Sequence, residues 1–589
     1  MSYKKVPIRV PPRLGKGWSL ALGFAASLAV ASLGGETKAA PVAGPDLILT
    51  NGRVYTVETA KPWAQAVAVK DGKILKVGSV AEIARLKRPN TKVVDLGGRL
   101  LMPAFGDAHA HPVFGGLSYS RCSLHDGKTL EDYQRIIADC VAKSPGQGTV
   151  FGSGWNQALF PPNGVPRKEI LDAVTTARPL IFESDGHTLW VNSKALAMAN
   201  ITRETPDPLN GKIDRDPATG EPGGGLEEAA MALMEKLTPP PTAKDREAAI
   251  GYTLKLFNSL GITSWHDAMV EWDASGASVV LDAYKAVKDR GELTVHTALD
   301  LQWNNGRGLD QLPDILKLTD RARNMGLRAT GVKFFIDGVI PQQTAAMLAP
   351  YEGTMEKGAS QIPLETLAEA VSQLDAKGLQ AHFHAIGDGG VREALDAVQR
   401  ARARDGMSDT RPMISHLNVV DPVDQPRFGQ LGVTAIFQPL WACDEPYMRL
   451  TIERIGPKRA GYIYPANSIL KAGGKLAYGA DWSVASANPL EGIEVALTRI
   501  APGDKDAKPL LADEAVTLAQ AVQAYTLNVA YVNHLDKQTG SILAGKSADL
   551  IVLDSDIFAI PTTEISKTKV LVTLFQGREV FGTLAALRP

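Results

Sequence analysis

The sequence contains few cysteines and no excess of charge of either sign. Only three of its 589 residues are cysteine, at positions 122, 140 and 443. This excludes a small disulfide-stapled domain and a cysteine-ligated zinc finger. One Cys122–Cys140 bridge is compatible with the sequence, which leaves it open. The net charge of −1 and the scattered basic residues argue against a nucleic-acid partner. With 44% apolar residues, the chain can form a large core in more than one structural unit.

An uncharged apolar run lies near the N-terminus. Residues 1–17 carry five basic residues and no acidic residue, Trp18–Leu33 is apolar, and the following GGETKAAPVAG has small residues suited to cleavage near Ala39. This order is typical of a secretory signal peptide, so we predict that residues 1–39 are removed and that the protein is exported, to the periplasm or beyond. After cleavage, no stable membrane insertion is expected. An uncleaved membrane anchor is the alternative, although the run is short for a full span.

Both ends of the remaining chain read as short β-strands. Residues 46–57 and 66–78 each contain a strand, an Asn-Gly or Asp-Gly pair, and a second strand, which predicts hairpins. Residues 540–556 and 569–582 have a similar pattern. We therefore predict one composite β-sandwich domain from residues 46–103 and 540–589.

The middle of the chain alternates apolar strands with helical patterns, which indicates parallel strands. Eight such units predict a TIM-type (β/α)8 barrel over residues 104–539. Segments around 117–178 and 205–225 are expected to be insertions, and 205–225 and 339–361 to be loops over the site. The eight predicted strands lie in residues 98–111, 178–186, 261–268, 331–338, 379–388, 411–418, 432–439 and 475–482.

Polar residues interrupt or close several of these apolar runs, which is costly unless each group is paired or bound. His109 and His111 are two residues apart, so they face the same way in a strand. Active sites of such barrels lie at the C-terminal strand ends, and imidazole and carboxylate suit zinc. His382 and His384 also share one face, so spacing does not choose between them. The strand-end candidates are His109, His111, Lys333, His384, His416 and Asp481.

Several longer motifs occur in a family-specific order. They include "GDAHAHP", "DGHTLWVNSKAL", "HFHAIGD", "ISHLN" and "GADWSV", which begin at residues 106, 185, 382, 414 and 479. With them, the chain resembles the amidohydrolase superfamily, in particular its amidohydrolase-3 group of proteins similar to N-substituted formamide deformylase. The resemblance covers nearly all of the chain after the signal, and it favours His384 over His382.

The resemblance implies a divalent metal centre, with zinc as the expected ion. His109, His111 and Asp481 would hold one ion, and His384 and His416 a second. Lys333 matches a lysine that is commonly carboxylated to bridge two ions. The alternative is a single ion with Lys333 unmodified.

The resemblance also implies metal-assisted hydrolysis. Asp481 would take a proton from water and deliver it to the leaving nitrogen. His187, placed at the end of the second predicted strand, is expected to orient or polarise the substrate carbonyl. We expect Trp155, Phe160 and Trp441 to line the substrate pocket.

These features predict a hydrolase that uses metal-activated water to cleave an amide-like, non-peptide C–N bond of a small molecule. A lactonase or carboxyl-ester hydrolase on the same centre is one alternative. A non-catalytic binding or regulatory barrel is another, although all expected metal ligands are present. A homo-oligomer is left open, and Asp107 is interpreted as a structural residue beside the site.

Overall fold

The computed structural model describes residues 44–587, apart from residues 145, 162–163, 185–186, 210, 239, 274 and 505. The predicted signal peptide, residues 1–39, lies outside the described residues. In the described part of the chain, no helix has both the length and the apolar character needed to cross a membrane.

An eight-stranded parallel sheet forms the centre of the structure and confirms the predicted barrel. Its strands are almost completely buried, which explains their near-continuous apolar sequences. The two outer strands meet through a parallel bridge between Ala110 and Trp482, which nearly closes the sheet. In barrel order the strands are β8 (Phe105–Ala110), β15 (Ile262–Val270), β16 (His296–Gln302), β17 (Ala329–Phe335), β18 (Gln380–Ala385), β19 (Met413–His416), β20 (Thr434–Phe437) and β21 (Lys475–Tyr478).

One predicted barrel strand is wrong. The apolar run at 178–186 contains β11 (Leu180–Glu183), which belongs to a different sheet. The third barrel strand is β16, whose apolar pattern is broken by His296 and the buried Asp300. A buried polar residue breaks the apolar pattern by which a buried strand is recognised. The sequence does not show that distant residues satisfy its hydrogen bonds. Lys333 nevertheless lies on the fourth strand, as predicted.

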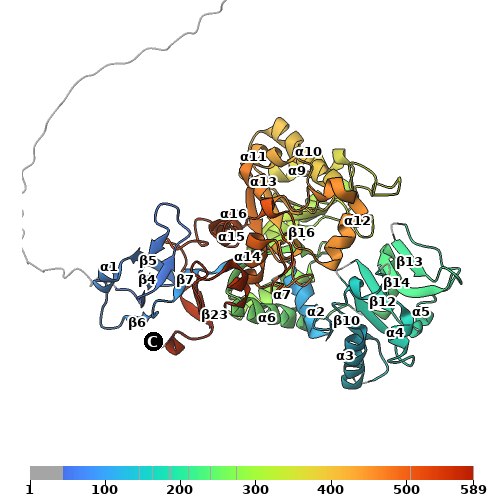
Figure 1. Cartoon of the computed structure of the whole chain (residues 1–589), viewed down its shortest axis with the longest axis horizontal. Coiled ribbons are helices and arrows are strands. Elements are labelled where there is room, and N and C mark those ends of the chain that lie inside the picture. The colour runs from blue at the N-terminus through green and yellow to red at the C-terminus, as the bar shows by residue number, and fades with distance from the viewer. Residues whose placement is uncertain are drawn as a thin grey trace, which may run out of the picture. The chain divides into compact units, whose positions relative to one another are not determined.

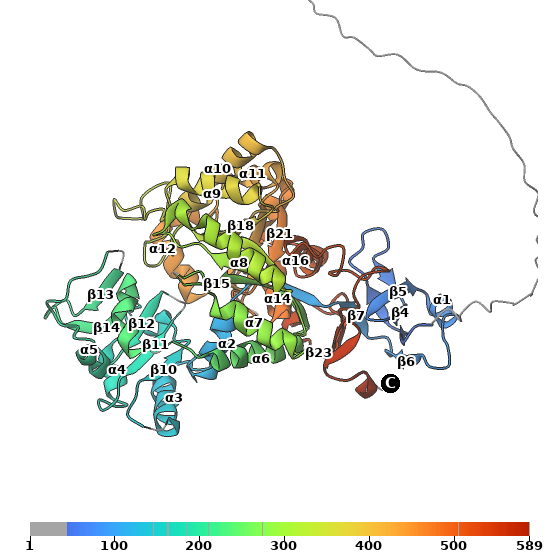
Figure 2. The ribbon, with the colours of Figure 1, turned by 180° about the vertical axis from the view of Figure 1, so that it is seen from behind.

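Helices cover the outside of the barrel with one apolar face each. For example, α9 (Leu364–Asp375) buries Leu367, Val371 and Leu374, which are spaced three and four residues apart. Figure 2 shows α6, α7 and α8 along one side of the barrel. The other barrel helices are α6 (Ala243–Ser259), α7 (Val279–Asp289), α8 (Leu312–Asn324), α10 (Asp388–Asp405), α11 (Gln425–Leu431), α12 (Pro446–Ala460), α13 (Ala466–Lys471), α14 (Pro489–Thr498), α15 (Leu518–Ala524) and α16 (Leu527–Val532).

An inserted sheet follows the first barrel strand and α2 (Pro112–Ser120). It has its own apolar cores and a Cys122–Cys140 disulfide, with the Cα atoms 5.8 Å apart. The predicted loop at 205–225 contains a hairpin of this sheet, because residues 211–215 pair with residues 222–228. The insert consists of β9 (Cys122–Ser123), β10 (Val150–Ser153), β11, β12 (Thr188–Val191), β13 (Gly211–Arg215), β14 (Pro222–Glu228), α3 (Leu130–Lys143), α4 (Lys168–Asp172) and α5 (Ser193–Met198).

Strands from the two ends of the described chain share one sheet and one apolar core. The C-terminal strand β22 pairs with the N-terminal strand β7, and both contribute to a core with Leu49 and Leu574. Figure 1 shows the blue strand β7 and the red strand β23 in the same region. One sheet contains β2 (Arg53–Tyr55), β3 (Trp63–Ala64), β7 (Leu100–Pro103), β22 (Leu550–Leu553), β23 (Val570–Phe575) and β24 (Arg578–Phe581); a second contains β1 (Leu47–Thr50), β4 (Ala66–Lys70), β5 (Lys73–Gly78) and β6 (Lys92–Asp95), with α1 (Val80–Ala84) beside it.

Short 3-10 helices complete the described secondary structure. They are η1 (Gln157–Leu159), η2 (Ala229–Leu237), η3 (Gly308–Gln311), η4 (Pro439–Trp441), η5 (Ala512–Glu514), η6 (Thr562–Lys567) and η7 (Leu584–Ala586).

Candidate metal centre

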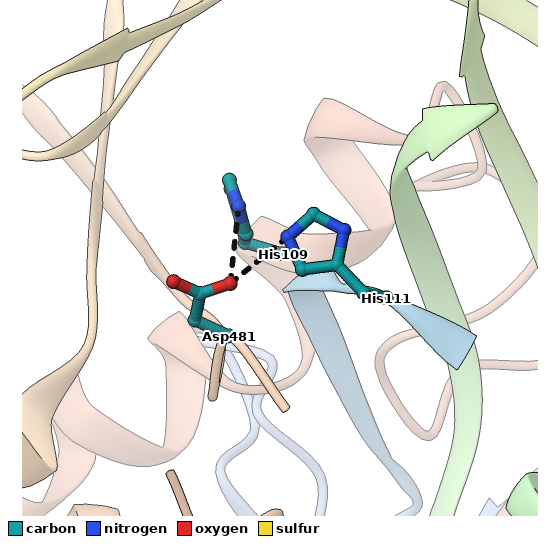
Figure 3. A group of neighbouring side chains, drawn as sticks. All are labelled: His109, His111 and Asp481. Carbon is teal, nitrogen blue, oxygen red and sulfur yellow. Dashed lines mark ion pairs between the residues drawn. The ribbon is translucent and has the colours of Figure 1, made fainter. Parts of the chain in front are cut away.

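Three side chains meet where the first and last barrel strands end. His109 is the second-to-last residue of β8, His111 immediately precedes α2, and Asp481 lies three residues after β21. Oδ1 of Asp481 is 3.0 Å from Nε2 of His111 and 3.5 Å from Nε2 of His109. Figure 3 shows this carboxylate oxygen directed at both rings. Strands 1 and 8 are neighbours in a closed barrel, so this grouping follows directly from the fold.

The donor set and its unpaired atoms fit a divalent metal ion. Oδ1 of Asp481 and Nδ1 of His111 are buried and have no hydrogen-bond partner. Leaving a buried polar atom unpaired costs about 1–3 kcal/mol, and a bound cation removes that cost for a carboxylate oxygen. Two imidazoles and one carboxylate are the ligands of many zinc sites.

The other three predicted metal residues lie beside this group. Nζ of Lys333 is 3.3 Å from Nε2 of His109. Nδ1 of His416 is 3.7 Å from Oδ2 of Asp481, and the rings of His384 and His416 have centroids 4.4 Å apart. The structure thus brings all six predicted residues to one end of the barrel.

Burial gives these side chains the protonation states that metal ligands need. It lowers the pKa of His109, His384 and His416 far below the ordinary value, and the nearby charges act in the same direction. Burial also lowers the pKa of Lys333 to about 7, although Asp481 and Asp300 oppose this shift. The three imidazoles are therefore neutral at physiological pH, as ligation requires.

Two candidate ligands have backbone conformations that are unusual for residues with a side chain. His416 has φ of 82° and Asp481 has φ of 54°. Such conformations persist where the surrounding structure determines them, and they concentrate at functional sites. Here both residues lie at strand ends and line the cavity beside the site.

Asp107 is a structural residue, as the sequence indicated. Its buried carboxylate accepts hydrogen bonds from the backbone N–H groups of His109, at 2.9 Å, and Ala480, at 3.1 Å. Burial raises its pKa to about 7. The side chain thus ties the end of β8 to the segment that carries Asp481, which fixes the two halves of the three-residue group.

A cavity of about 580 Å³ opens next to the six residues. Its wall includes His384, His416 and Asp481 from the barrel and Trp155 and His187 from the insert. Trp441 also lines it and stacks on His416, with ring centroids 5.7 Å apart. Phe160 was expected here, but it packs in the core of the insert against Trp155 and Trp190 and does not line this cavity.

His187 reaches the cavity from the insert and not, as predicted, from a barrel strand. It lies in the turn between β11 and β12. Its Nδ1 is 3.1 Å from Oε1 of Glu228, and its ring centroid is 6.5 Å from that of His384. The backbone N–H of Glu228 also donates to the carbonyl of His187, at 2.9 Å. Glu228 therefore contacts both the backbone and the imidazole of His187 and holds the ring beside the cavity.

Other polar residues near the site hold the framework. His266 and Asp267, which the sequence assigned to the third barrel strand, lie on the second, β15. Asp337 accepts backbone hydrogen bonds from Ala346, Ile386 and Gly387 and comes within 3.9 Å of His384. It thereby links the 339–361 loop to the end of β18.

The sequence did not point to His125, which lies at the cavity, or to Glu228, which contacts His187. His125 lines the wall, and its Nδ1 is 2.9 Å from Oγ of Ser123. Glu228 contacts His187, whereas the preceding Glu227 lies 3.4 Å from Lys212. The two glutamates are adjacent in the sequence, and only the strand register decides which one faces His187.

A (β/α)8 barrel with metal-type side chains converging beside a cavity is the architecture of metal-dependent barrel enzymes. The model of the amidohydrolase family matches residues 92–581. The chain belongs to the amidohydrolase family.

Relatives span almost the full chain. LONG AFTER FAR-RED 3 of Arabidopsis thaliana is 30% identical and covers 91% of each chain. N-substituted formamide deformylase of Arthrobacter pascens is 28% identical over 90% of this chain and 97% of its own. The putative amidohydrolase YtcJ of Bacillus subtilis is 26% identical over 90% and 98%.

Solved structures agree on the fold. An uncharacterized metal-dependent hydrolase from Pyrococcus horikoshii superposes with a TM-score of 0.68 at 23% identity, over 88% of this chain and 99% of that chain. A similar protein from Pyrococcus furiosus gives 0.66 at 24% identity, over 87% and 99%.

Proposed function

We propose that this protein hydrolyses an amide-like, non-peptide C–N bond of a small molecule. The observation that carries the proposal is the convergence of five metal-type side chains and Lys333 beside a cavity of about 580 Å³. That volume suits a small molecule. The relative from Arthrobacter pascens, named for the deformylation of N-substituted formamides, supports a C–N bond as the target.

We propose zinc as the ion and two ions as the full complement. His109, His111 and Asp481 would hold one, and His384 and His416 the other. Bound there, a divalent ion lowers the pKa of water and polarises a carbonyl group. The imidazoles of His109, His384 and His416, which burial keeps neutral, would supply ligation, and the Asp481 carboxylate would supply negative charge.

Lys333 is proposed to carry a carboxyl group. A neutral lysine amine adds to carbon dioxide and releases one proton, which leaves an anionic carbamate. The low pKa of buried Lys333, about 7, supplies the neutral amine. A carbamate would also replace an ammonium, which two cations would repel, with two anionic oxygens. The alternative of one ion and an unmodified lysine predicts half the metal content.

Asp481 would transfer protons, and His187 would hydrogen-bond the substrate carbonyl. Asp481 lines the cavity from the barrel and His187 from the insert. Asp481 takes a proton from the attacking water and passes it to the leaving nitrogen. His187, oriented by Glu228, donates a hydrogen bond to the carbonyl oxygen as negative charge develops there. Trp155 and Trp441 hold the apolar part of the substrate.

The decisive experiment is hydrolysis by metal-free and zinc-restored protein of a matched panel. The panel contains formamides, longer N-acyl amines, lactones and simple esters. We expect zinc-dependent turnover of the amides above that of the lactones. Faster lactone or ester turnover would favour the ester-hydrolase alternative. A folded, metal-replete protein that cleaves none of the panel would favour a binding or regulatory barrel.

We also propose that the protein is exported. The apolar run before Ala39 supports this, and the Cys122–Cys140 disulfide suits an oxidising compartment. Cell fractionation with N-terminal sequencing tests it. We expect a mature start near residue 40 outside the cytoplasm; a full-length N-terminus in the membrane fraction would indicate an anchor.

A further inference from the structure

A row of buried polar side chains continues from the metal centre into the barrel interior. It runs from His109 through Ser415, His382, Asp300 and His266 to Asn533, and every member is 0% exposed. These residues come from five barrel strands and the end of α16. Polar groups this deep are costly unless all are hydrogen-bonded, and here they bond to one another.

The centre of the row is a carboxylate between two imidazoles. Oδ2 of Asp300 is 2.6 Å from Nε2 of His266 and 2.6 Å from Nδ1 of His382. The far nitrogen of His266 is 2.8 Å from Oδ1 of Asn533. Although burial opposes it, the charge of Asp300 and its hydrogen bond raise the pKa of His266.

The spacing argues that these three residues form hydrogen bonds and do not hold an ion of their own. Ligands of one tetrahedral zinc ion lie about 2.0–2.2 Å from it and therefore more than about 3 Å from each other. The contacts of 2.6 Å in this triad are too short for that and suit a charge-assisted hydrogen bond.

The donors and acceptors along the row can be assigned in sequence. A carboxylate only accepts, so His382 presents an N–H at Nδ1 and, as a neutral ring, a lone pair at Nε2. Nε2 of His382 is 3.1 Å from Nδ1 of His109, and both nitrogens lie within 2.8 Å of Oγ of Ser415. His109 can therefore donate from Nδ1, which leaves its Nε2 bare, and this is the nitrogen that faces Asp481.

We propose that Asp300 and His382 are positioning residues of the metal centre, which hold His109 in the tautomer and orientation that present a bare Nε2 to the ion. The inference rests on the proposed metal centre but not on any substrate. A ligating histidine commonly donates its other N–H to a carboxylate or carbonyl. Here an imidazole, itself oriented by Asp300, and a serine take that place.

The main test is metal affinity, measured on the full mature protein by competition with a chromophoric chelator. Asp300→Asn keeps the shape but adds an N–H that can face His382. We expect zinc affinity to fall about 10- to 100-fold, which is typical when a residue that orients a metal ligand by hydrogen bonding is replaced. The absorption bands of the cobalt-substituted protein should also shift, because the orientation of His109 changes.

Asp549→Asn is the matched control. Asp549 is also buried, and its Oδ2 is 2.8 Å from Nε2 of His296. His296 lies on β16, the strand that carries Asp300. Asp549 lies outside the row, so this variant should share the stability loss but keep wild-type zinc affinity and cobalt bands. Equal affinities and identical bands for wild type and Asp300→Asn would overturn the proposal.

A measurement on the unaltered protein covers the case in which Asp300→Asn does not fold. Nitrogen-15 NMR of histidine-labelled, zinc-loaded protein should show His382 protonated at Nδ1, with its signal assigned by its loss in His382→Gln. Protonation at Nε2 would overturn the proposal. If wild type binds no zinc at all, the proposed metal centre fails first, which separates the two failures.

Discussion

The two walls of the cavity are built in different ways. The barrel wall carries the six metal-centre residues on or directly after parallel strands, whose register fixes each side chain. The insert wall carries His187 and Trp155 in turns of a separate sheet. The side chains of His109 and Asp481 are 0% and 8% exposed, whereas those of His187 and Glu228 are 22% and 30% exposed.

This difference gives the two walls different expected roles in catalysis and substrate binding. A rigid, desolvated wall suits chemistry that depends on fixed ligand geometry. A wall built from turns can change without disturbing that geometry, as binding surfaces on loops commonly do. We therefore expect barrel-wall substitutions to change metal content or kcat, and insert-wall substitutions to change kcat/KM and the choice of substrate without changing metal content.

The largest expected effect is the loss of metal from the barrel wall. His109→Ala removes a ligand and one end of the buried row, so the protein should purify with its first metal position largely empty. Elemental analysis of the folded variant measures this. Unchanged metal content per chain would remove His109 from the ligand set.

Asp481→Asn separates chemistry from metal binding in the same wall. The amide still offers an oxygen to the ion but cannot accept a proton, so most metal should stay. Loss of a proton acceptor should lower kcat by about 10²- to 10⁴-fold. Steady-state kinetics and metal analysis of one sample test this together, and full retained turnover would exclude Asp481 as the base.

A smaller effect is expected on the insert wall. Glu228→Gln replaces the carboxylate that orients His187, and loss of such a charged hydrogen bond should lower kcat/KM by about 10-fold. Metal content should not change. Glu227→Gln is the control, because the neighbouring side chain faces Lys212 and not the cavity. Equal kinetics for the two variants would contradict a role for Glu228.

The same contrast explains what could be predicted from sequence. The residues of the barrel wall interrupt apolar runs, so a histidine such as His416 at a strand end is conspicuous in the pattern. Parallel strands then bring these ends together without further information. The barrel and the convergence of its ligands could therefore be inferred before any coordinates.

The insert wall could not be inferred in this way. The run at 178–186 is as apolar as a barrel strand, and only its pairing with β10 and β12 places it elsewhere. That misassignment placed His187 on the wrong element. The buried row was hidden for a related reason, because Asp300 is satisfied by His266 and His382 from other strands.

The smallest expected effect concerns stability on the insert wall. Burial lowers the pKa of His125 to about 4. The unfolded chain therefore binds the proton near pH 6.5 and the folded chain only near pH 4, so stability falls as the pH drops through this window. Because the ring is partly exposed, we expect a loss of about 1–2 kcal/mol.

Denaturant unfolding at pH 7 and pH 4 should show His125→Gln losing less stability than wild type. Ser123→Ala keeps the imidazole and should keep the wild-type pH dependence; identical pH dependence for His125→Gln and wild type would show that this ring does not sense pH.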